Sequence, residues 1–379
     1  MTPDALAEHV AALPILDHHA HGLYPEALWR AEPIEPYFTE SADPEILARH
    51  VPHNLYFRRS IRHLAELYGC DPTPDAVRTA RQAQDYPALC ARLMRETGIS
   101  LLLMDDGIWQ GRLLTVEQMN ALLPTRRVAR IEAEAAALLR EAPDARVYLE
   151  RVEAHFDALA PGLVALKSIA AYRTGLDITR PELSEVQRDL DALLRETPED
   201  RTPRLNRKAL LDATLHAALR AGLRHGLPIQ FHTGYGDPDL DLRLANPLHL
   251  RALLEDPELR GLHVVMLHGY PFIREAGYLA SVYPGAWLDV GLTIPYTSTH
   301  GMVTAWHESL HLSPITKVLF STDAQRTPEM FWLAARAGRS TLTRALGETV
   351  EAGDLSPEEA RWAARRLLHD NAAELYKAD

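Results

Sequence analysis

Cysteine and lysine are both scarce in this chain of 379 residues. The two cysteines, Cys70 and Cys90, lack the spacing of a metal-binding motif and are too few for a disulfide framework, so we expect free thiols in a reducing compartment. Lysine supplies only four of the 40 basic side chains, which makes each lysine a residue to examine for function. The sequence therefore excludes a fold built on disulfides.

Long hydrophobic runs and an excess of positive charge are also missing. No apolar run approaches the roughly 20 residues of a membrane-spanning helix, and the first ten residues, MTPDALAEHV, lack the pattern of a secretory signal. The net charge of −12 disfavours binding to nucleic acid or to anionic membranes, because both require a basic surface. We therefore expect a cytoplasmic protein that acts on a small-molecule substrate, and homo-oligomer formation stays open.

Short apolar runs recur along the chain, and the composition, 46% hydrophobic and 24% charged, is typical of a globular protein. The runs do not alternate with polar residues, which favours parallel strands buried on both faces. Eight such runs separated by helical patterns predict an α/β protein with a (β/α)8 TIM barrel. They lie at residues 13–17, 99–106, 126–132, 162–170, 227–234, 263–269, 286–291 and 317–323.

Helical periodicity separates the later runs and also fills residues 24–97, after the first run. No linker rich in glycine and serine flanks residues 24–97, so we expect a single domain over residues 1–379 in which this segment is a helical insertion that caps the barrel. A further helix over 356–376 is expected outside the eight repeats. The other expected helices lie at 208–226, 248–259, 273–283, 302–312 and 330–350.

Functional residues of a TIM barrel gather at the carboxyl ends of its strands. His19 and His21 end the first run, and their spacing puts both imidazoles on one face of a strand, with His18 expected to face away. Alone, such a pair is more often structural than metal-binding. Four of the later runs also contain side chains that bind metals or move protons: the fourth strand carries Lys167, and three others end in His232, His268 and Asp323.

The segments that contain these residues resemble the amidohydrolase superfamily, and especially its two-metal members. The resemblance covers essentially the whole chain, and KVLFSTDAQRTPEMFWLAARAGR is most similar to the nodulin/FluG-like branch, which also occurs fused to glutamine-synthetase-like domains. It implies a metal-dependent hydrolase of C–N (amide) bonds. The matching segments are LDHHAH, ALKSIAAYR, FHTGYGD, MLHGYPF, FSTDA and HDNAAELY.

The resemblance also implies how the ligands are divided between two divalent cations. His19, His21 and Asp323 would hold one cation, and His232 and His268 would hold the other. Zinc is the first expectation, although manganese and iron accept the same ligands.

Lys167 has two possible roles. Carboxylated by carbon dioxide, as the resemblance implies, it would bridge two cations about 3.5–4 Å apart. A bridging hydroxide activated by the metals would then attack the substrate, and Asp323 would take the proton and pass it to the leaving group. In the alternative, Lys167 pairs with the substrate and the site holds one metal.

Three further side chains are candidates for substrate binding. Tyr172 and Arg173 follow the fourth strand, and Arg326 follows Asp323; either arginine could bind a carboxylate through two hydrogen bonds. A small carboxylate-bearing amide, such as a γ-glutamyl amide, is the substrate class that this suggests. The alternatives are a one-metal decarboxylase or sugar-acid isomerase of the same superfamily, and a barrel that binds a ligand without turnover.

A competing zinc signal lies at His307-Glu308-Ser309-Leu310-His311, which matches the HExxH protease motif. We expect this helix on the outside of the barrel, with Glu329, the possible third ligand, beyond a barrel strand. The protease interpretation is therefore disfavoured. A nucleophile elbow and a phosphate-binding loop are both absent from the sequence.

Overall fold

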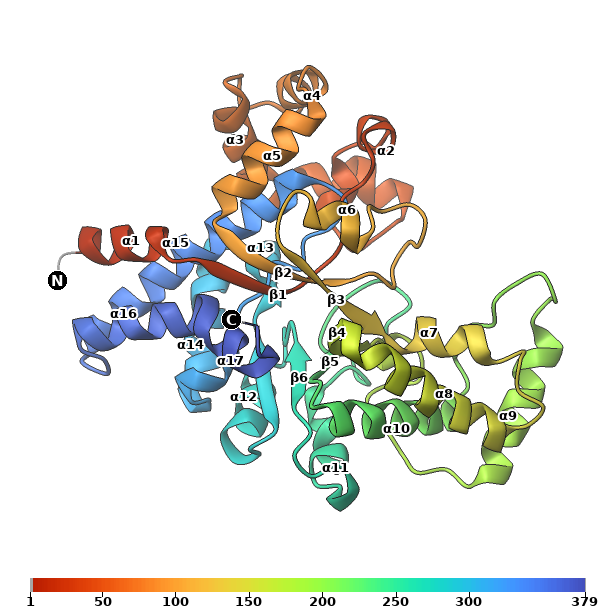
Figure 1. Cartoon of the computed structure of the whole chain (residues 1–379). Helices are drawn as coiled ribbons and strands as arrows, with labels where there is room; N and C mark the ends of the chain where they lie inside the picture. The colour runs from red at the N-terminus through yellow and green to blue at the C-terminus, as the bar shows by residue number, and fades with distance from the viewer. Residues whose placement is uncertain (1–2, 379) are drawn as a thin grey trace.

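The computed structural model describes residues 3–378, and parallel strands stand at its centre (Figure 1). Eight strands follow one another around a nearly closed barrel in the order β1-β2-β3-β4-β5-β6-β7-β9, so the predicted (β/α)8 fold is confirmed. The two-residue β8 (Gly291–Leu292) lies outside this sheet. The barrel strands are β1 (Ile15–Ala20), β2 (Ile99–Asp105), β3 (Thr125–Arg130), β4 (Leu163–Ser168), β5 (Ile229–His232), β6 (Val264–Leu267), β7 (Ala286–Asp289) and β9 (Val318–Leu319).

The barrel closes through the segment that follows β9. This segment runs beside the end of β1, where the Asp323 N–H donates to the His19 carbonyl at 3.1 Å and the His21 N–H donates to the Ala324 carbonyl at 2.8 Å. These hydrogen bonds continue the parallel pairing of the strands, although the segment after β9 is not itself a strand. They also bring Asp323, which is distant in sequence, next to the two histidines of β1.

Helices pack around the strands in groups that are visible in Figure 1. Four of the five helices predicted between and after the later strands are present at the expected places, namely α10, α12, α14 and α15. The apolar faces of α8, α10 and α12 belong to one buried cluster with β4, β5 and β6. The α-helices between β2 and the C-terminal segment are α6 (Val116–Asn120), α7 (Ile131–Leu138), α8 (Ala145–Leu159), α9 (Leu183–Glu196), α10 (Lys208–His225), α11 (Arg251–Leu254), α12 (Ile273–Val282), α13 (Thr293–Tyr296), α14 (Thr299–Leu312) and α15 (Pro328–Ala352).

The prediction of one helix over residues 248–259 was wrong. The chain there forms η6 (Pro247–Leu250), the four-residue α11 and η7 (Pro257–Leu259). Pro257 has no backbone N–H to continue a helix, and the Asp256 side chain accepts from the Glu258 N–H at 2.9 Å. A new turn therefore starts where the helix was expected to continue.

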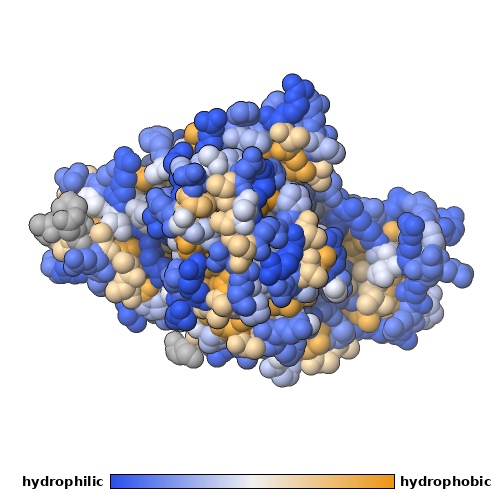
Figure 2. Space-filling view, turned by 90° about the horizontal axis from the view of Figure 1, so that it is seen from above, coloured by the Kyte–Doolittle hydropathy of each residue, from blue (hydrophilic) through white to orange (hydrophobic). Residues whose placement is uncertain are grey.

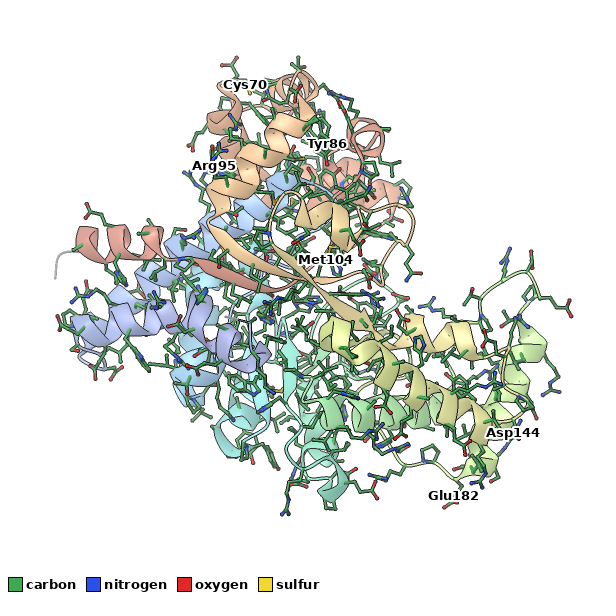
Figure 3. The ribbon with its side chains drawn as sticks, viewed as in Figure 1. Cys70, Tyr86, Arg95, Met104, Asp144 and Glu182 are labelled. Atoms are coloured by element: carbon green, nitrogen blue, oxygen red, sulfur yellow. The ribbon has the colours of Figure 1, made fainter. Side chains whose placement is uncertain are left out.

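Residues 24–97 form the expected helical segment, and Figure 3 places Cys70 and Tyr86 in it. Side chains of Asn54, Thr73 and Asp85 cap three of its helices by accepting from backbone N–H groups of the first turn. Both cysteines are free thiols. The elements are α2 (Glu26–Ala31), η1 (Glu35–Phe38), η2 (Ile46–His50), η3 (Val51–His53), α3 (Leu55–Tyr68), α4 (Pro74–Gln82) and α5 (Tyr86–Thr97).

The C-terminal segment is not one helix over 356–376 but three pieces, α16 (Pro357–Arg365), the π-turn η9 (Arg366–Asp370) and α17 (Asn371–Tyr376). Apolar side chains of α17 join Leu16, Val265 and other barrel-facing side chains of the strands in one buried cluster. The C-terminal segment therefore packs against the barrel-facing side chains of the strands. At the other end of the sequence, α1 (Pro3–Ala12) packs against α15 and α16.

The surface seen in Figure 2 is covered mainly by hydrophilic residues, with hydrophobic ones in small scattered groups. Within residues 3–378, none of the helices combines the length and the apolar character needed to cross a membrane.

Candidate metal centre

A cavity of about 650 Å³ opens at the carboxyl ends of the strands. Of the six non-glycine residues with positive φ angles among residues 3–378, all but Lys377 line it, and these five are Trp109 (44°), His268 (73°), Leu292 (59°), Asp323 (49°) and Arg326 (68°). Side chains disfavour this backbone region, and such strain is typical of functional sites. The backbone therefore singles out the same cavity to which the strand-end residues point.

His19 and His21 share a carboxylate at the floor of this cavity. The Asp323 Oδ1 atom lies 3.3 Å from His19 Nε2 and 3.5 Å from His21 Nε2. The opposite nitrogen of each ring is also engaged, because His19 Nδ1 lies 2.9 Å from the Gln230 side-chain carbonyl and His21 Nδ1 lies 3.0 Å from the Asp105 backbone carbonyl. Acceptors at Nδ1 leave Nε2 of both rings as the atom that faces the cavity with a lone pair.

The other predicted ligands complete one group. Lys167 Nζ lies 3.4 Å from His19 Nε2, and the His268 ring centroid lies 5.7 Å from that of His19 and 4.7 Å from that of His232. Ligand atoms of His19, His268 and Asp323 all lie within 4.8 Å of one another. The six residues predicted from strand ends therefore meet in one place, and their role as metal ligands stays a prediction.

The electrostatics of the group match the protonation states that metal ligands require. Burial lowers the pKa of His19 to about 4 and holds the pKa values of His232 and His268 well below their usual range, so these imidazoles are neutral. Burial also lowers the pKa of Lys167 to about 8. Burial alone would raise the pKa of Asp323, but the surrounding imidazoles hold it well below its usual range.

His18 does not line the cavity with His19 and His21, but it lies inside the barrel and not on its outer face, where strand alternation alone would place it. The pairing of β1 with β2 shifts register between Asp17 and Ala20, and this bulge lets neighbouring side chains turn into the barrel. His18 Nε2 lies 3.0 Å from Asp289 Oδ1, and its Nδ1 lies 3.1 Å from the Tyr376 hydroxyl. His18 is therefore an interior residue beneath the ligand group.

The predicted substrate-binding residues differ in how many contacts they already make with other residues of the protein. Tyr172, at the end of η5 (Ala170–Tyr172), places its ring centroid 4.4 Å from that of His232. Arg173 lines the cavity, its Nε atom is buried without a hydrogen-bond partner, and no carboxylate of residues 3–378 forms an ion pair with it. Arg173 is therefore a guanidinium available to an anionic ligand.

Arg326 also lines the cavity but is held by the protein. Its Nη2 donates to the Pro36 carbonyl at 2.9 Å, and its guanidinium carbon lies 4.9 Å from the ring centroids of both Tyr37 and Trp109. These contacts join the segment after β9 to the insertion and to the loop after β2. Arg326 therefore anchors the cavity wall, and it has less freedom than Arg173 to bind a substrate.

Some cavity residues carry a weaker sequence signal. Asp237 follows a ligand strand, as the predicted sites do, but Glu40 comes from the insertion, where no motif marks it. Burial raises the pKa of both carboxyl groups. Gln230 could have been found, because a polar residue inside the apolar run of β5 is unusual, whereas Tyr376 reaches the barrel only through the folded C-terminal segment.

The HExxH segment does not form a metal site. His307 Nε2 lies 2.9 Å from a Glu348 carboxylate oxygen of α15, and Glu308 pairs with Arg274 of α12. The proposed third ligand, Glu329, pairs with Arg81. Both clusters of three potential ligands found within the described chain contain His19 instead.

Comparison with known proteins gives consistent similarities. The Amidohydrolase family model matches residues 191–378. Protein fluG of Emericella nidulans is 32% identical over a 413-residue alignment that covers 99% of this chain and 47% of that protein, so the chain spans about half the length of this curated relative.

Solved structures show the same similarity. A candidate metal-dependent hydrolase of Lactobacillus casei ATCC 334 is 29% identical, with a TM-score of 0.86 over 98% of this chain and 97% of that one. The uronate isomerase of Thermotoga maritima is 12% identical, with a TM-score of 0.67 over 99% of this chain and 97% of that one, and this likeness concerns the fold.

Proposed function

Because the chain belongs to the amidohydrolase superfamily, we propose that it is a metal-dependent hydrolase that cleaves a C–N (amide) bond in a small, carboxylate-bearing substrate. The observation that carries this proposal is the meeting of His19, Lys167 and Asp323 with three further histidines in one cavity. Neutral buried imidazoles beside an ionised carboxylate suit divalent cations better than they suit any purely structural role.

The residues fit a pair of divalent cations. Ligand atoms of His19, His268 and Asp323 lie within 4.8 Å of one another, which is close enough to share an ion. His19, His21 and Asp323 would hold one cation, and His232 and His268 the other. Zinc is the first expectation and manganese or iron the alternatives. When bound, the cations would supply Lewis acidity that lowers the pKa of water and polarises the amide carbonyl.

Lys167 is proposed to be carboxylated. Its lowered pKa, about 8, keeps a useful fraction of the amine neutral at physiological pH. The neutral nitrogen adds to the carbon of carbon dioxide and releases one proton, which gives a carbamate with a negative charge. A negative group at this position, 3.4 Å from His19 Nε2, would offset the charge of two neighbouring cations.

Asp323 and Arg173 have separate tasks in this proposal. The low pKa of Asp323 keeps it ionised, so it can take a proton from the attacking water and deliver it to the leaving nitrogen. Arg173, which has no carboxylate partner among the described residues, binds the substrate carboxylate through two parallel hydrogen bonds. Tyr172 forms part of the wall beside His232.

Metal analysis of the purified protein tests the centre. We expect two metals per chain in the wild type and a lower content in Lys167→Ala. The matched control is the double variant His307→Ala and His311→Ala, which removes two histidines of α14 that do not line the cavity and should leave metal content unchanged. One metal per chain in both wild type and Lys167→Ala would contradict the bridged site and favour a one-metal decarboxylase or isomerase.

Kinetic assays of the purified wild type and of Arg173→Ala test the proposed substrate class. We expect kcat/KM to be about ten- to hundredfold higher for a γ-glutamyl amide than for an analogue that lacks the carboxylate. The analogue cannot form the pair of charge-assisted hydrogen bonds with Arg173. Arg173→Ala should remove most of this difference. Equal turnover of both amides by the wild type would contradict recognition of a carboxylate.

A further inference from the structure

The hydroxyl of Tyr376, at the end of α17, enters a buried polar network beneath the candidate metal centre. It lies 3.0 Å from Gln230 Nε2 and 3.1 Å from His18 Nδ1. All three side chains are at least 96% buried. In such a place each donor needs an acceptor, so the hydrogen positions can be worked out by elimination.

One arm of the network runs from Tyr376 through Gln230 to His19. Gln230 Nε2 lies 2.7 Å from the His18 backbone carbonyl, which can only accept, so the amide nitrogen must point there. The amide oxygen then faces His19 Nδ1 at 2.9 Å and must receive its proton. His19 is thereby held in the tautomer that leaves Nε2 bare toward Asp323 and Lys167.

The other arm runs from Tyr376 through His18 and Asp289 to His268. Since Gln230 donates to the phenol oxygen, the phenol proton is directed to His18 Nδ1, and the protonated Nε2 of His18 donates to Asp289 Oδ1 at 3.0 Å. Asp289 Oδ2 accepts from the His268 backbone N–H at 3.1 Å. This contact supports the positive φ angle of 73° that His268 adopts.

We propose that Tyr376 is a positioning residue. Its hydroxyl holds in place the Gln230 amide that fixes the tautomer of His19, and through His18 and Asp289 it supports the backbone of His268, so metal binding depends on the docking of the C-terminal helix. The inference rests on the proposed metal centre but not on the reaction. One phenol touches both arms, and His19 and His268 belong to the two different cations of that centre. Loss of this hydroxyl therefore affects both halves of the ligand set.

Tyr376→Phe removes the hydroxyl and keeps the ring that packs against the barrel. Removing a hydrogen-bond partner that orients a metal-ligating histidine typically lowers metal affinity about 10- to 100-fold. We expect a loss of affinity in that range for zinc, measured by competition with a chelator of known affinity. We also expect a changed visible absorption spectrum of the cobalt-substituted protein, because the orientation of His19 at the ion changes.

Tyr148→Phe is the matched control. Tyr148 is also fully buried, and its hydroxyl lies 3.2 Å from Thr214 Oγ1 between α8 and α10, outside the cavity lining. It should lower the melting temperature of the metal-free protein about as much as Tyr376→Phe does, with zinc affinity unchanged. Equal zinc affinity in wild type and Tyr376→Phe, or an equal loss in both variants, would overturn the inference. A wild type that binds no metal would instead overturn the proposed function.

Discussion

Glu40 stands in the cavity wall beside Asp237, and neither carboxyl group forms an ion pair with a basic side chain within residues 3–378. Burial, with smaller contributions from Asp237 and Asp323, raises the pKa of Glu40 to about 7. In an unfolded chain a glutamate titrates near 4.3. Between these values the folded protein holds a proton that the unfolded chain has lost, so this group makes stability fall as pH rises through the window.

Glu40→Gln should therefore change stability in a pH-dependent way. The glutamine mimics the protonated acid, so the variant should match the wild type near pH 4 and be more stable above pH 7, by on the order of 2 kcal/mol. Urea unfolding of both proteins from pH 4 to pH 8 measures the difference. A difference that stays constant across this range would show that Glu40 titrates as an ordinary surface glutamate.

Individual residues were predictable where position along a strand determines their neighbours. Lys167 lies near the carboxyl end of β4 and Asp323 ends an apolar run, and the barrel brings strand ends together whatever the details of packing. His18, Glu40 and Tyr376 were not predictable in the same way. Their places depend on a bulge in β1, on the path of the insertion and on the docking of α17, and none of these leaves a local pattern in the sequence.

Among the elements, α4 of the insertion and α15 of the barrel are joined by a buried ion pair. Arg81 Nε donates to Glu329 at 2.8 Å, both side chains are almost fully buried, and the Arg81 guanidinium carbon lies 4.1 Å from the Trp29 ring centroid. The Tyr68 hydroxyl donates to the same carboxylate oxygen at 2.8 Å. Since α15 begins just after Arg326, this pair ties the insertion to the wall of the cavity.

Glu329→Gln should strongly destabilise the protein because it leaves the Arg81 charge buried without a counter-charge. Breaking such a pair costs about 3–5 kcal/mol. The control, Glu348→Gln, removes an exposed partner of Arg344 on the same helix and should cost no more than about 1 kcal/mol. Urea unfolding, with proteolysis at sites in residues 24–97, measures both variants. Similar costs for the two would mean that the buried pair does not hold the insertion.

Elements were predictable where one periodicity dominates a segment. The strand runs and the long amphipathic helices α10 and α15 appear within a few residues of their expected bounds. The segments 248–259 and 356–376 did not form single helices, since Pro257 interrupts the first and a π-turn at 366–370 redirects the second toward the barrel. Hydrophobic period alone cannot reveal a break that local hydrogen bonding or tertiary docking imposes.

For the whole molecule, the repeat of eight strand–helix units was sufficient to predict the barrel, since parallel strands with helical crossovers have few ways to bury both faces. The same closure distributes the site over the chain. His19 lies near its start, Asp323 near its end, and the supporting Tyr376 in the last helix. The ligand group therefore exists only in the folded molecule.

Metal removal should consequently lower the stability of the entire fold. A ligand that binds only the native state stabilises it by about 4 kcal/mol when present at a thousand times its dissociation constant. We expect chelation to lower the melting temperature by several degrees and added zinc to restore it. In Asp323→Asn, which removes the carboxylate that faces both His19 and His21, added zinc should raise the melting temperature less. Melting curves that do not respond to zinc in the wild type would contradict a metal centre assembled from both ends of the chain.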